Sequence, residues 1–228
     1  MRGIFITGTG TGVGKSIVAA AVCAALSDRG ERVAAFKPAV TGLDDQVGEW
    51  PPDHELLATA ASAGQRPDDV APYRFGPAVS PHLAAALAGE RIEPALLAER
   101  ARAAAERADA LVCEGVGGLL VPLSGDYLVR DLALELGLPL VVAASPGLGT
   151  INHTLLTIGA ARQAGLTVAG VAMTPWPAHA GELERSNADT VARLAGVEVE
   201  EFPDCELGAL AEAGGALPLA RWLAARNN

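Results

Sequence analysis

A glycine-rich segment near the start of the chain could bind phosphate groups. Residues Gly8–Ser16 read GTGTGVGKS and follow the short apolar run Ile4–Thr7. Glycines let the backbone curl so that several amides point at one anion, and the N-terminus of a following helix adds a favourable dipole. Lys15 supplies a positive charge for the terminal phosphates, and the Ser16 hydroxyl suits Mg²⁺. The segment therefore predicts a nucleoside triphosphate site, although five residues separate its first and last glycines instead of the usual four.

Two further charged residues end apolar runs. Lys37 ends the run Val33–Lys37, and Glu114 ends the run Ala110–Glu114. An acid at the end of a strand is where nucleoside triphosphatases hold Mg²⁺ or its water ligands. The three glycines within Gly115–Gly118 could turn backbone amides toward an oxyanion. Because carboxyl ends of parallel strands meet at one edge, we expect both charges beside the phosphate loop. The alternatives are a solvated surface lysine and a salt-bridged glutamate in a tight turn.

A polar loop over Thr41–Pro52 is long enough to be functional. It contains Asp44 and Asp45, and Asp53 follows it directly. Asp53 is predicted to begin a helix, so a helix cap is an alternative role for it. Residue types alone do not choose among these three acids.

The segment Gly147–Thr154 reads GLGTINHT, follows an apolar run and opens a predicted helix. Its free amides could hold a carboxylate. The simpler interpretation is a strand-to-helix turn with Thr150 as the cap. His153 taken alone predicts a structural role, and the four histidines of the chain show no metal-ligand spacing.

The elements that position these residues alternate between strand and helix. The strand candidates are almost continuously apolar, as expected of parallel strands covered on both faces. The alternation predicts one α/β domain over residues 1–228, with a doubly wound, mainly parallel sheet and helices on both faces. The predicted strands are Ile4–Thr7, Val33–Lys37, Ala110–Glu114, Leu138–Ala144 and Val168–Met173. The predicted helices are Lys15–Ser27, His54–Ala63, Pro81–Ala88, Pro94–Arg107, Val129–Leu136, Ile151–Ala164 and Glu182–Leu194.

Composition narrows the class of protein. The 228 residues are 50% hydrophobic and 19% charged, which is typical of a compact globular chain. A net charge of -10 argues against nucleic acid or an anionic membrane as a partner. Cys23, Cys113 and Cys205 form no CxxC pair, which predicts free thiols in a reducing cytoplasm. We also expect no signal peptide and no membrane span, because no uncharged apolar run reaches about 18 residues.

These motifs together resemble the dethiobiotin synthetases, the ATP-dependent cyclo-ligases of biotin biosynthesis. The resemblance covers almost the whole chain, and the lengthened phosphate loop is a mark of that family. It implies a P-loop NTPase-like domain that works as a homodimer on small molecules. The motifs that carry it are Thr7–Ser16, Lys37–Gly42, Ser80–His82, Glu114–Gly118 and Gly149–Thr154.

The resemblance also implies a reaction. The substrates are 7,8-diaminopelargonate (7,8-diaminononanoate), CO₂ and ATP, with Mg²⁺ as cofactor. One amine forms a carbamate with CO₂, and the carbamate oxygen attacks the γ-phosphate to give a carbamic–phosphoric anhydride. The second amine then closes the cyclic urea and releases phosphate. Since a carbamate and a triphosphate repel each other, Lys15, Lys37 and Mg²⁺ would offset their charges.

The resemblance assigns roles to individual residues. Lys15 and Lys37 would be catalytic, and Asp53 is favoured over Asp44 and Asp45 as a metal ligand. The distal carboxylate of the substrate would bind amides of one subunit with help from the dimer partner. Metal ligands would be Ser16, Asp53 and Glu114. Nucleotide-binding residues would be Thr11, Gly12, Val13, Gly14, Lys15, Ser16, Asp53, Glu114, Gly117, Thr174 and Pro203. Substrate-binding residues would be Thr41, Ser80, Gly118, Leu148, Gly149, Asn152 and Asn187.

Three positions depart from the family pattern. Ser16 replaces the commoner threonine and keeps its hydroxyl, and Gly12 stands where some members carry an acid. Members often place Asn-Asp after the fifth strand to read adenine, whereas Met173–Pro177 reads MTPWP here. Thr174 lacks the paired donor and acceptor of an amide, so relaxed use of other nucleotides is a hypothesis.

Two other classes of protein compete with this interpretation. Cobyrinic acid amidating ligases usually carry an added glutaminase domain, for which this chain has no room and no obvious Cys-His set. Partitioning or metallochaperone-like ATPase switches typically carry a second lysine early in the loop. The segment Gly8–Gly14 contains no lysine, and no basic or amphipathic tail suits docking on DNA or a membrane.

Overall fold

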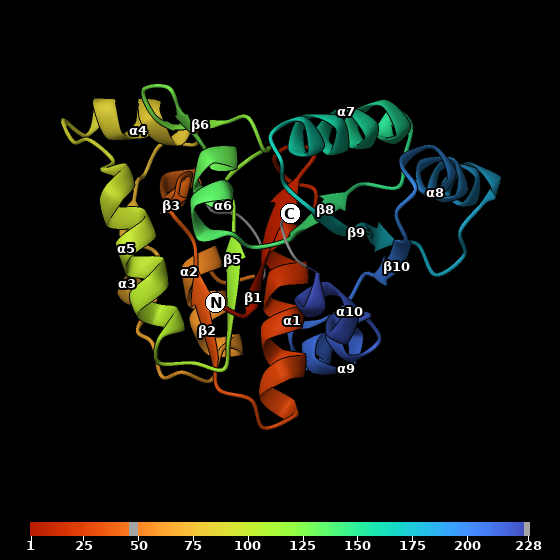
Figure 1. Ribbon diagram of the computed structural model, residues 1–228, viewed down its shortest axis with the longest axis horizontal. Helices are drawn as coiled ribbons and strands as arrows, with labels where there is room; N and C mark the ends of the chain where they lie inside the picture. Colours follow the sequence, from red (N-terminus) through yellow and green to blue (C-terminus); the bar gives the residue numbers. More distant parts are fainter. Residues whose placement is uncertain (46–49, 226–228) are drawn as a thin grey trace.

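One sheet of six parallel strands lies at the centre of the computed structural model, which describes residues 1–45 and 50–225 (Figure 1). The strand order is β10-β9-β8-β1-β5-β2. Because every neighbouring pair is parallel, the carboxyl ends of all six strands lie at the same edge of the sheet. The strands are β1 (Gly3–Gly8), β2 (Val33–Phe36), β5 (Ala110–Glu114), β8 (Leu140–Ala144), β9 (Val168–Trp176) and β10 (Val199–Pro203).

Alternate residues of each strand pack into cores on opposite faces of the sheet. Ile4 and Ile6 of β1 belong to one core, whereas Phe5 packs on the other face with Leu111. The doubly wound α/β fold expected from the sequence is therefore confirmed. The first face is covered by α1 (Lys15–Asp28), α2 (Asp53–Ala60), α9 (Leu210–Gly215) and α10 (Leu219–Ala224). The second is covered by α5 (Pro94–Ala105), α6 (Val129–Leu136), α7 (Thr150–Gln163) and α8 (Glu182–Ala195).

Smaller elements flank the sheet, and β3, β6 and α4 lie near its upper edge in Figure 1. Two-stranded pairs are formed by β3 with β4 and by β6 with β7. The bounds are β3 (Ala39–Val40), β4 (Tyr73–Arg74), β6 (Pro122–Ser124), β7 (Tyr127–Leu128), α3 (Pro67–Val70) and α4 (Pro81–Leu87), with 3-10 turns η1 (Leu43–Asp45) and η2 (Leu207–Ala209). Residues 46–49 of the loop expected over Thr41–Pro52 lie outside the described residues.

All predicted strands and helices form, and their ends differ for physical reasons. The helix predicted over His54–Ala63 ends at Ala60, because the amides of Ser62 and Ala63 donate to the Val33 carbonyl at 3.1 and 2.9 Å. The strand predicted over Val168–Met173 continues to Trp176, which pairs with β10. The strand β10 is not among those that the sequence predicts. This edge strand carries Glu200 and Glu201, so it lacks the apolar run that marks a strand covered on both faces.

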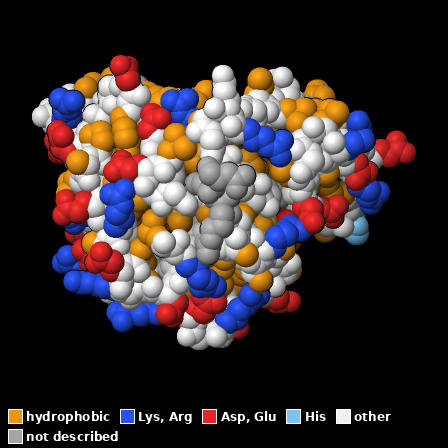
Figure 2. Space-filling model, in the orientation of Figure 1, with side chains coloured by type: hydrophobic (Ala, Val, Ile, Leu, Met, Phe, Trp, Pro, Cys, Tyr) orange, Lys and Arg blue, Asp and Glu red, His pale blue; other side chains and the backbone are white. Residues whose placement is uncertain are grey.

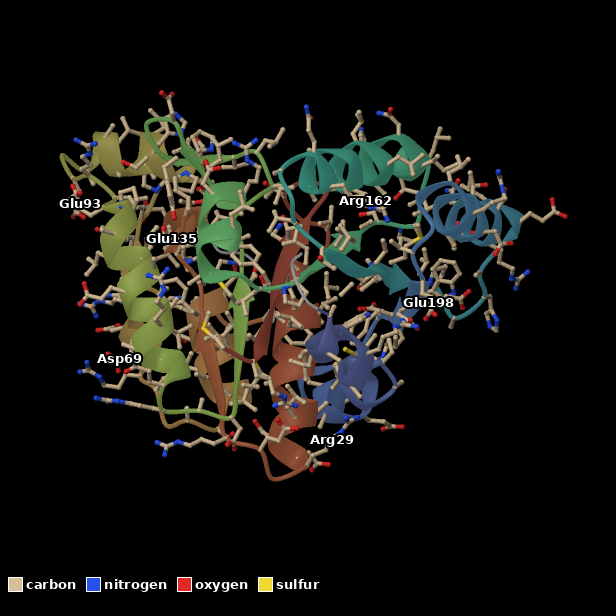
Figure 3. The ribbon with its side chains drawn as sticks, in the orientation of Figure 1. Arg29, Asp69, Glu93, Glu135, Arg162 and Glu198 are labelled. Atoms are coloured by element: carbon tan, nitrogen blue, oxygen red, sulfur yellow. The ribbon has the colours of Figure 1, made fainter. Side chains whose placement is uncertain are left out.

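The surface carries both signs of charge. Lys and Arg side chains are interspersed with Asp and Glu over the face seen in Figure 2. Charged side chains such as Asp69 and Glu93 lie at the outer side of the helical layer in Figure 3. The cysteines are free as predicted, with Cys23 and Cys113 buried and Cys205 partly buried. Among the described residues, no helix combines the length and apolar character needed to cross a membrane.

Close packing of α1 against α9 makes one glycine sensitive to substitution. A Cβ atom added at Gly214 would lie 2.0 Å from the Ala21 carbonyl oxygen, whereas Gly215 has no atom within 4 Å of that position. We expect Gly214→Ala to lower the free energy of unfolding by about 1–3 kcal/mol, because backbone atoms must move apart. The matched control Gly215→Ala should be neutral or raise it by up to about 1 kcal/mol. Equal urea midpoints for the two variants would contradict this packing.

Candidate functional site

The phosphate loop joins β1 to α1 and takes a shape that requires glycine. Gly12 and Gly14 have φ angles of 74° and 81°, in the left-handed region that other residues rarely adopt. A Cβ atom added at Gly14 would lie 2.6 Å from Cγ2 of Thr174, so the loop packs closely on the end of β9. Gly14 is also the N-cap of α1, and the positive end of the helix dipole therefore faces the loop.

Lys15 folds back over this loop. Its Nζ donates to the Gly10 carbonyl oxygen at 2.7 Å, and the residue is only 7% exposed. Burial lowers the pKa of Lys15 to about 8, against the opposing charge of Glu114. A carbonyl neutralises an ammonium group less well than an anion does, so Lys15 is poised to exchange this contact for a phosphate oxygen.

Lys37 forms the centre of a buried ionic cluster at the carboxyl ends of β2 and β5. Its Nζ lies 2.6 Å from Oδ2 of Asp53 and 2.5 Å from Oε1 of Glu114. Glu114 is completely buried and also accepts a hydrogen bond from Oγ of Ser16 at 2.8 Å. The alternative of a solvated surface lysine is wrong, since Lys37 is 3% exposed, whereas Glu114 is salt-bridged as its own alternative expected.

The cluster shifts the pKa of each of its members. Burial raises the pKa of Glu114 above its ordinary value, although the charge of Lys37 opposes the shift. Burial acts the same way on Asp53, but Lys37, Ser16 and Lys15 together outweigh it and hold the pKa of Asp53 below its ordinary value. Burial lowers the pKa of Lys37, yet the two carboxylates prevail and raise it. The raised pKa keeps Lys37 protonated and positively charged near neutral pH.

Oxygen atoms suited to Mg²⁺ gather around the cluster. Oε2 of Glu114 is buried without a hydrogen-bond partner in the described residues, beside Asp53 and the Ser16 hydroxyl. Mg²⁺ prefers such oxygen ligands and usually keeps waters and phosphate oxygens besides one or two carboxylates. Within residues 1–45 and 50–225, no group of three His, Cys, Asp or Glu side chains could hold a metal by itself. The site thus fits a cation that is shared with a bound triphosphate.

A cavity of about 580 Å³ connects the phosphate loop to an apolar wall. Lys15, Lys37 and Glu114 line its polar end. Of the three acids that the sequence left open, Asp53 lines it, whereas the Asp44 carboxylate packs at Gly76. The other predicted residues that line it are Thr11, Gly12, Gly14, Ser16, Thr41, Ser80 and Gly117, and the wall comprises Ala78, Val79, Pro81, Val116 and Val121.

Other predicted site residues lie outside this cavity. Leu148, Gly149 and Asn152 are exposed at the start of α7. Asn187 is 5% exposed, and its Nδ2 donates to the carbonyl oxygens of Pro146 and Gly147 at 2.8 and 3.1 Å. Asn187 therefore braces the loop before α7 within its own chain. The roles assigned to these four residues stay predictions.

The remaining predicted residues surround the phosphate loop or the end of the sheet. Gly118 lies against the loop backbone, since a Cβ atom added there would be 3.5 Å from the Gly8 carbonyl oxygen. The Val13 side chain packs over Gly8. Thr174 is 3% exposed, and Pro203 lies exposed at the end of β10. None of these four lines the cavity, and their roles in nucleotide or substrate binding stay predictions.

Sequence reasoning missed Trp50, Ile17 and the apolar wall of the cavity. Ile17 follows the phosphate loop on the same helix, so its position could have been inferred from the motif. Trp50 stands alone in a polar loop where no periodic pattern gives its direction. The wall residues come from two separate loops, which meet only in the folded chain.

The ionic cluster predicts a pattern of stabilities. Lys37→Ala should lower the free energy of unfolding by about 3 kcal/mol, because it leaves Glu114 buried without its cation. The double variant Lys37→Ala/Glu114→Gln should recover at least about 1 kcal/mol of this loss, since it removes the completely buried charge of Glu114. Chemical denaturation of the single and double variants measures both values. A double variant less stable than Lys37→Ala would contradict the arrangement.

Known proteins resemble this chain over most of its length. A family described as "AAA domain" matches residues 2–200. The ATP-dependent dethiobiotin synthetase BioD of Anaeromyxobacter dehalogenans is 43% identical over 194 residues, which cover 85% of this chain and 86% of the relative. The protein of the same name from Bacillus subtilis is 33% identical over 87% of this chain and 85% of the relative.

Solved structures share the fold at low sequence identity. The cell division ATPase MinD of Pyrococcus furiosus superposes with a TM-score of 0.56 and 18% identity, over 98% of this chain and 97% of that one. A ParA family ATPase from Chlorobium tepidum gives 0.52 and 15%, over 97% and 95%. These two likenesses concern the fold alone, whereas the two relatives above are 43% and 33% identical to this chain over the aligned residues. By their extent, this chain belongs to the family of ATP-dependent dethiobiotin synthetases.

Proposed function

We propose that this chain is a dethiobiotin synthetase of biotin biosynthesis, which closes the ureido ring from 7,8-diaminopelargonate, CO₂ and ATP and releases ADP and phosphate. Family membership supports this proposal. The observation that carries it within the structure is the meeting of Lys15, Lys37 and the buried Glu114 at one cavity. A phosphate loop and an apolar wall share that cavity, as a reaction between a triphosphate and an alkyl diamine requires.

Lys15 and Lys37 would offset the negative charges of the two reacting groups. A carbamate must approach the γ-phosphate, and both are anions. Lys37 is held rigidly by two carboxylates, so its ammonium group is in place before the substrates arrive. Lys15 reaches from the loop toward the terminal phosphates. Together with the N-terminus of α1 they stabilise the charge that develops on the transferring phosphoryl group.

A magnesium site completes the proposal. Ser16, Asp53 and Glu114 are the residues that would hold Mg²⁺, and the orphaned Oε2 of Glu114 supports this assignment. When bound, the ion neutralises phosphate charge and orients the triphosphate. Because both carboxylates already contact Lys37, the same residues fix the cation of the protein and the cation of the nucleotide.

The rest of the cavity would take the diamine. Thr41, Ser80 and the amides of Gly117 and Gly118 would hold the carbamate end, and the wall beside Val79 would cover the alkyl chain. No histidine lines the cavity, and the reaction needs little general-base help since the carbamate is already an anion. We also infer a cytoplasmic location, which the three free cysteines support.

A homodimer belongs to the same proposal. Leu156 on α7 is 64% exposed, and Asn152 and Ala160 share its helix face. Ala160 also lines a surface groove with Leu120 and Leu134, which are 52% and 37% exposed. Exposed apolar side chains on one surface favour contact with a second copy. Such a contact would bring the loop before α7 toward the diamine site of the partner.

The proposed activity has a direct test. Incubation with diaminopelargonate, bicarbonate, Mg²⁺ and ATP should yield dethiobiotin, detected by its mass. Lys37→Ala should lower turnover at least about 1,000-fold, because a preorganised cation at the transferring phosphoryl group is lost. Far-UV circular dichroism at low temperature checks that this variant remains folded. ATP hydrolysis that does not depend on the diamine, with no dethiobiotin formed, would overturn the proposal.

The dimer has a separate test. Leu156→Glu should shift the protein to the monomer mass in light scattering, because it places a charge in the apolar contact. Leu194→Glu changes a leucine that is 55% exposed at the end of α8 and serves as the control. It should leave the dimer intact. A monomeric unmodified protein, or a dimer unaffected by Leu156→Glu, would contradict this interface.

A further inference from the structure

Trp50 borders two cavities at once. It lines the phosphate cavity together with Ile17 and Asp53. It also lines a second cavity, of about 600 Å³, formed by Asp204 to Gly208. The side chain is partly buried and packs against the core beneath α1, so it is anchored while it still borders both spaces.

The second cavity lies where a bound nucleotide would extend. Its loop begins directly after β10, and the carboxyl end of this strand shares the sheet edge of β1 and the phosphate loop. Ligands of such folds bind along this edge. Trp50 thus stands between the place of the phosphates and the loop at the end of β10.

The charged side chains that line the two cavities differ, which would set the direction in which a nucleotide binds. Lys15 and Lys37 line the first cavity, whereas no Lys or Arg of the described residues lines the second. Asp204 and Glu206 line the second and would repel a triphosphate. An uncharged base avoids this repulsion, and its N–H groups can donate to carboxylates. The base end of a nucleotide therefore suits the space beside Trp50.

Thr174 is not placed to contact the nucleotide base. It is 3% exposed, its methyl group packs beside Gly14, and it lines neither cavity. The base must therefore meet other groups. An indole ring offers a broad apolar face on which any base can stack.

We propose that Trp50 is the platform on which the nucleotide base stacks, with the loop Asp204–Gly208 beside it. This inference rests on the proposed function for the presence of a nucleotide. It assigns the binding of the base to a tryptophan in the loop before α2. Stacking tolerates every base, so Trp50 contributes to affinity while the acidic loop favours bases that carry an amino group.

Calorimetric titration of Trp50→Leu and Trp50→Phe with ATP and with inorganic tripolyphosphate tests the proposal. Both substitutions shorten the side chain, but only phenylalanine keeps a ring. Trp50→Leu should weaken ATP binding about 10-fold or more, and Trp50→Phe less than about 3-fold. Tripolyphosphate has no base, so its affinity should stay within about 2-fold in both variants. An unchanged ATP affinity in Trp50→Leu, or equal losses for both ligands, would overturn the role of Trp50.

Tryptophan fluorescence gives an independent readout that does not depend on the leucine variant. Trp176 and Trp222 are 8% and 0% exposed, so Trp50 is the tryptophan best placed to respond to a ligand. ATP should quench the emission of the unmodified protein, and this quenching should vanish in Trp50→Phe. Quenching that persists there would contradict the proposal. Turnover of the unmodified protein is measured in parallel, so that loss of the proposed function is distinguished from failure of the stacking assignment.

Discussion

The buried ion pair between Lys37 and Glu114 holds the parts of the candidate site together. A carboxylate that is completely buried is stable only when a cation compensates its charge. Lys37 provides that charge from the neighbouring strand, and Asp53 at the start of α2 holds it from the other side. The cluster therefore ties β2, β5 and α2 together at one point. It also fixes a positive charge beside the phosphate loop before any substrate binds.

The parallel sheet makes this convergence possible. All six strands end at one edge, so the segments that follow β1, β2 and β5 reach one cavity, where residues 78–81 join them. Tight packing sets their spacing. Gly14 touches Thr174, and Gly118 lies against the backbone of the phosphate loop. A side chain at Gly14 would push the loop away from the end of β9, and the helix dipole would no longer face the bound anion.

Much of the fold and of the phosphate loop could be predicted from local sequence patterns. The features that were missed depend on solvent exposure or on contacts that form only in the folded chain. Apolar runs identified the buried strands, and the glycine-lysine-serine motif located Lys15 and Ser16 at the start of α1. The edge strand β10 was missed, because solvent on its outer side permits Glu200 and Glu201. The choice of Asp53 needed a family resemblance, since only the folded chain places it at 2.6 Å from Lys37. No local sequence pattern around Trp50 predicts that its side chain borders the cavity.

We propose that the two lysines bring a carbamate into attack on the γ-phosphate. Turnover with CO₂ labelled with ¹⁸O measures this directly, because the attacking oxygen of a carbamate comes from CO₂. Attack by a carbamate predicts released phosphate that carries one labelled oxygen, together with label in the ureido carbonyl of the product. Unlabelled phosphate, formed as fast as dethiobiotin, would show that water or another nucleophile attacks the γ-phosphate. That result would contradict the role assigned to the site between Lys15 and Lys37.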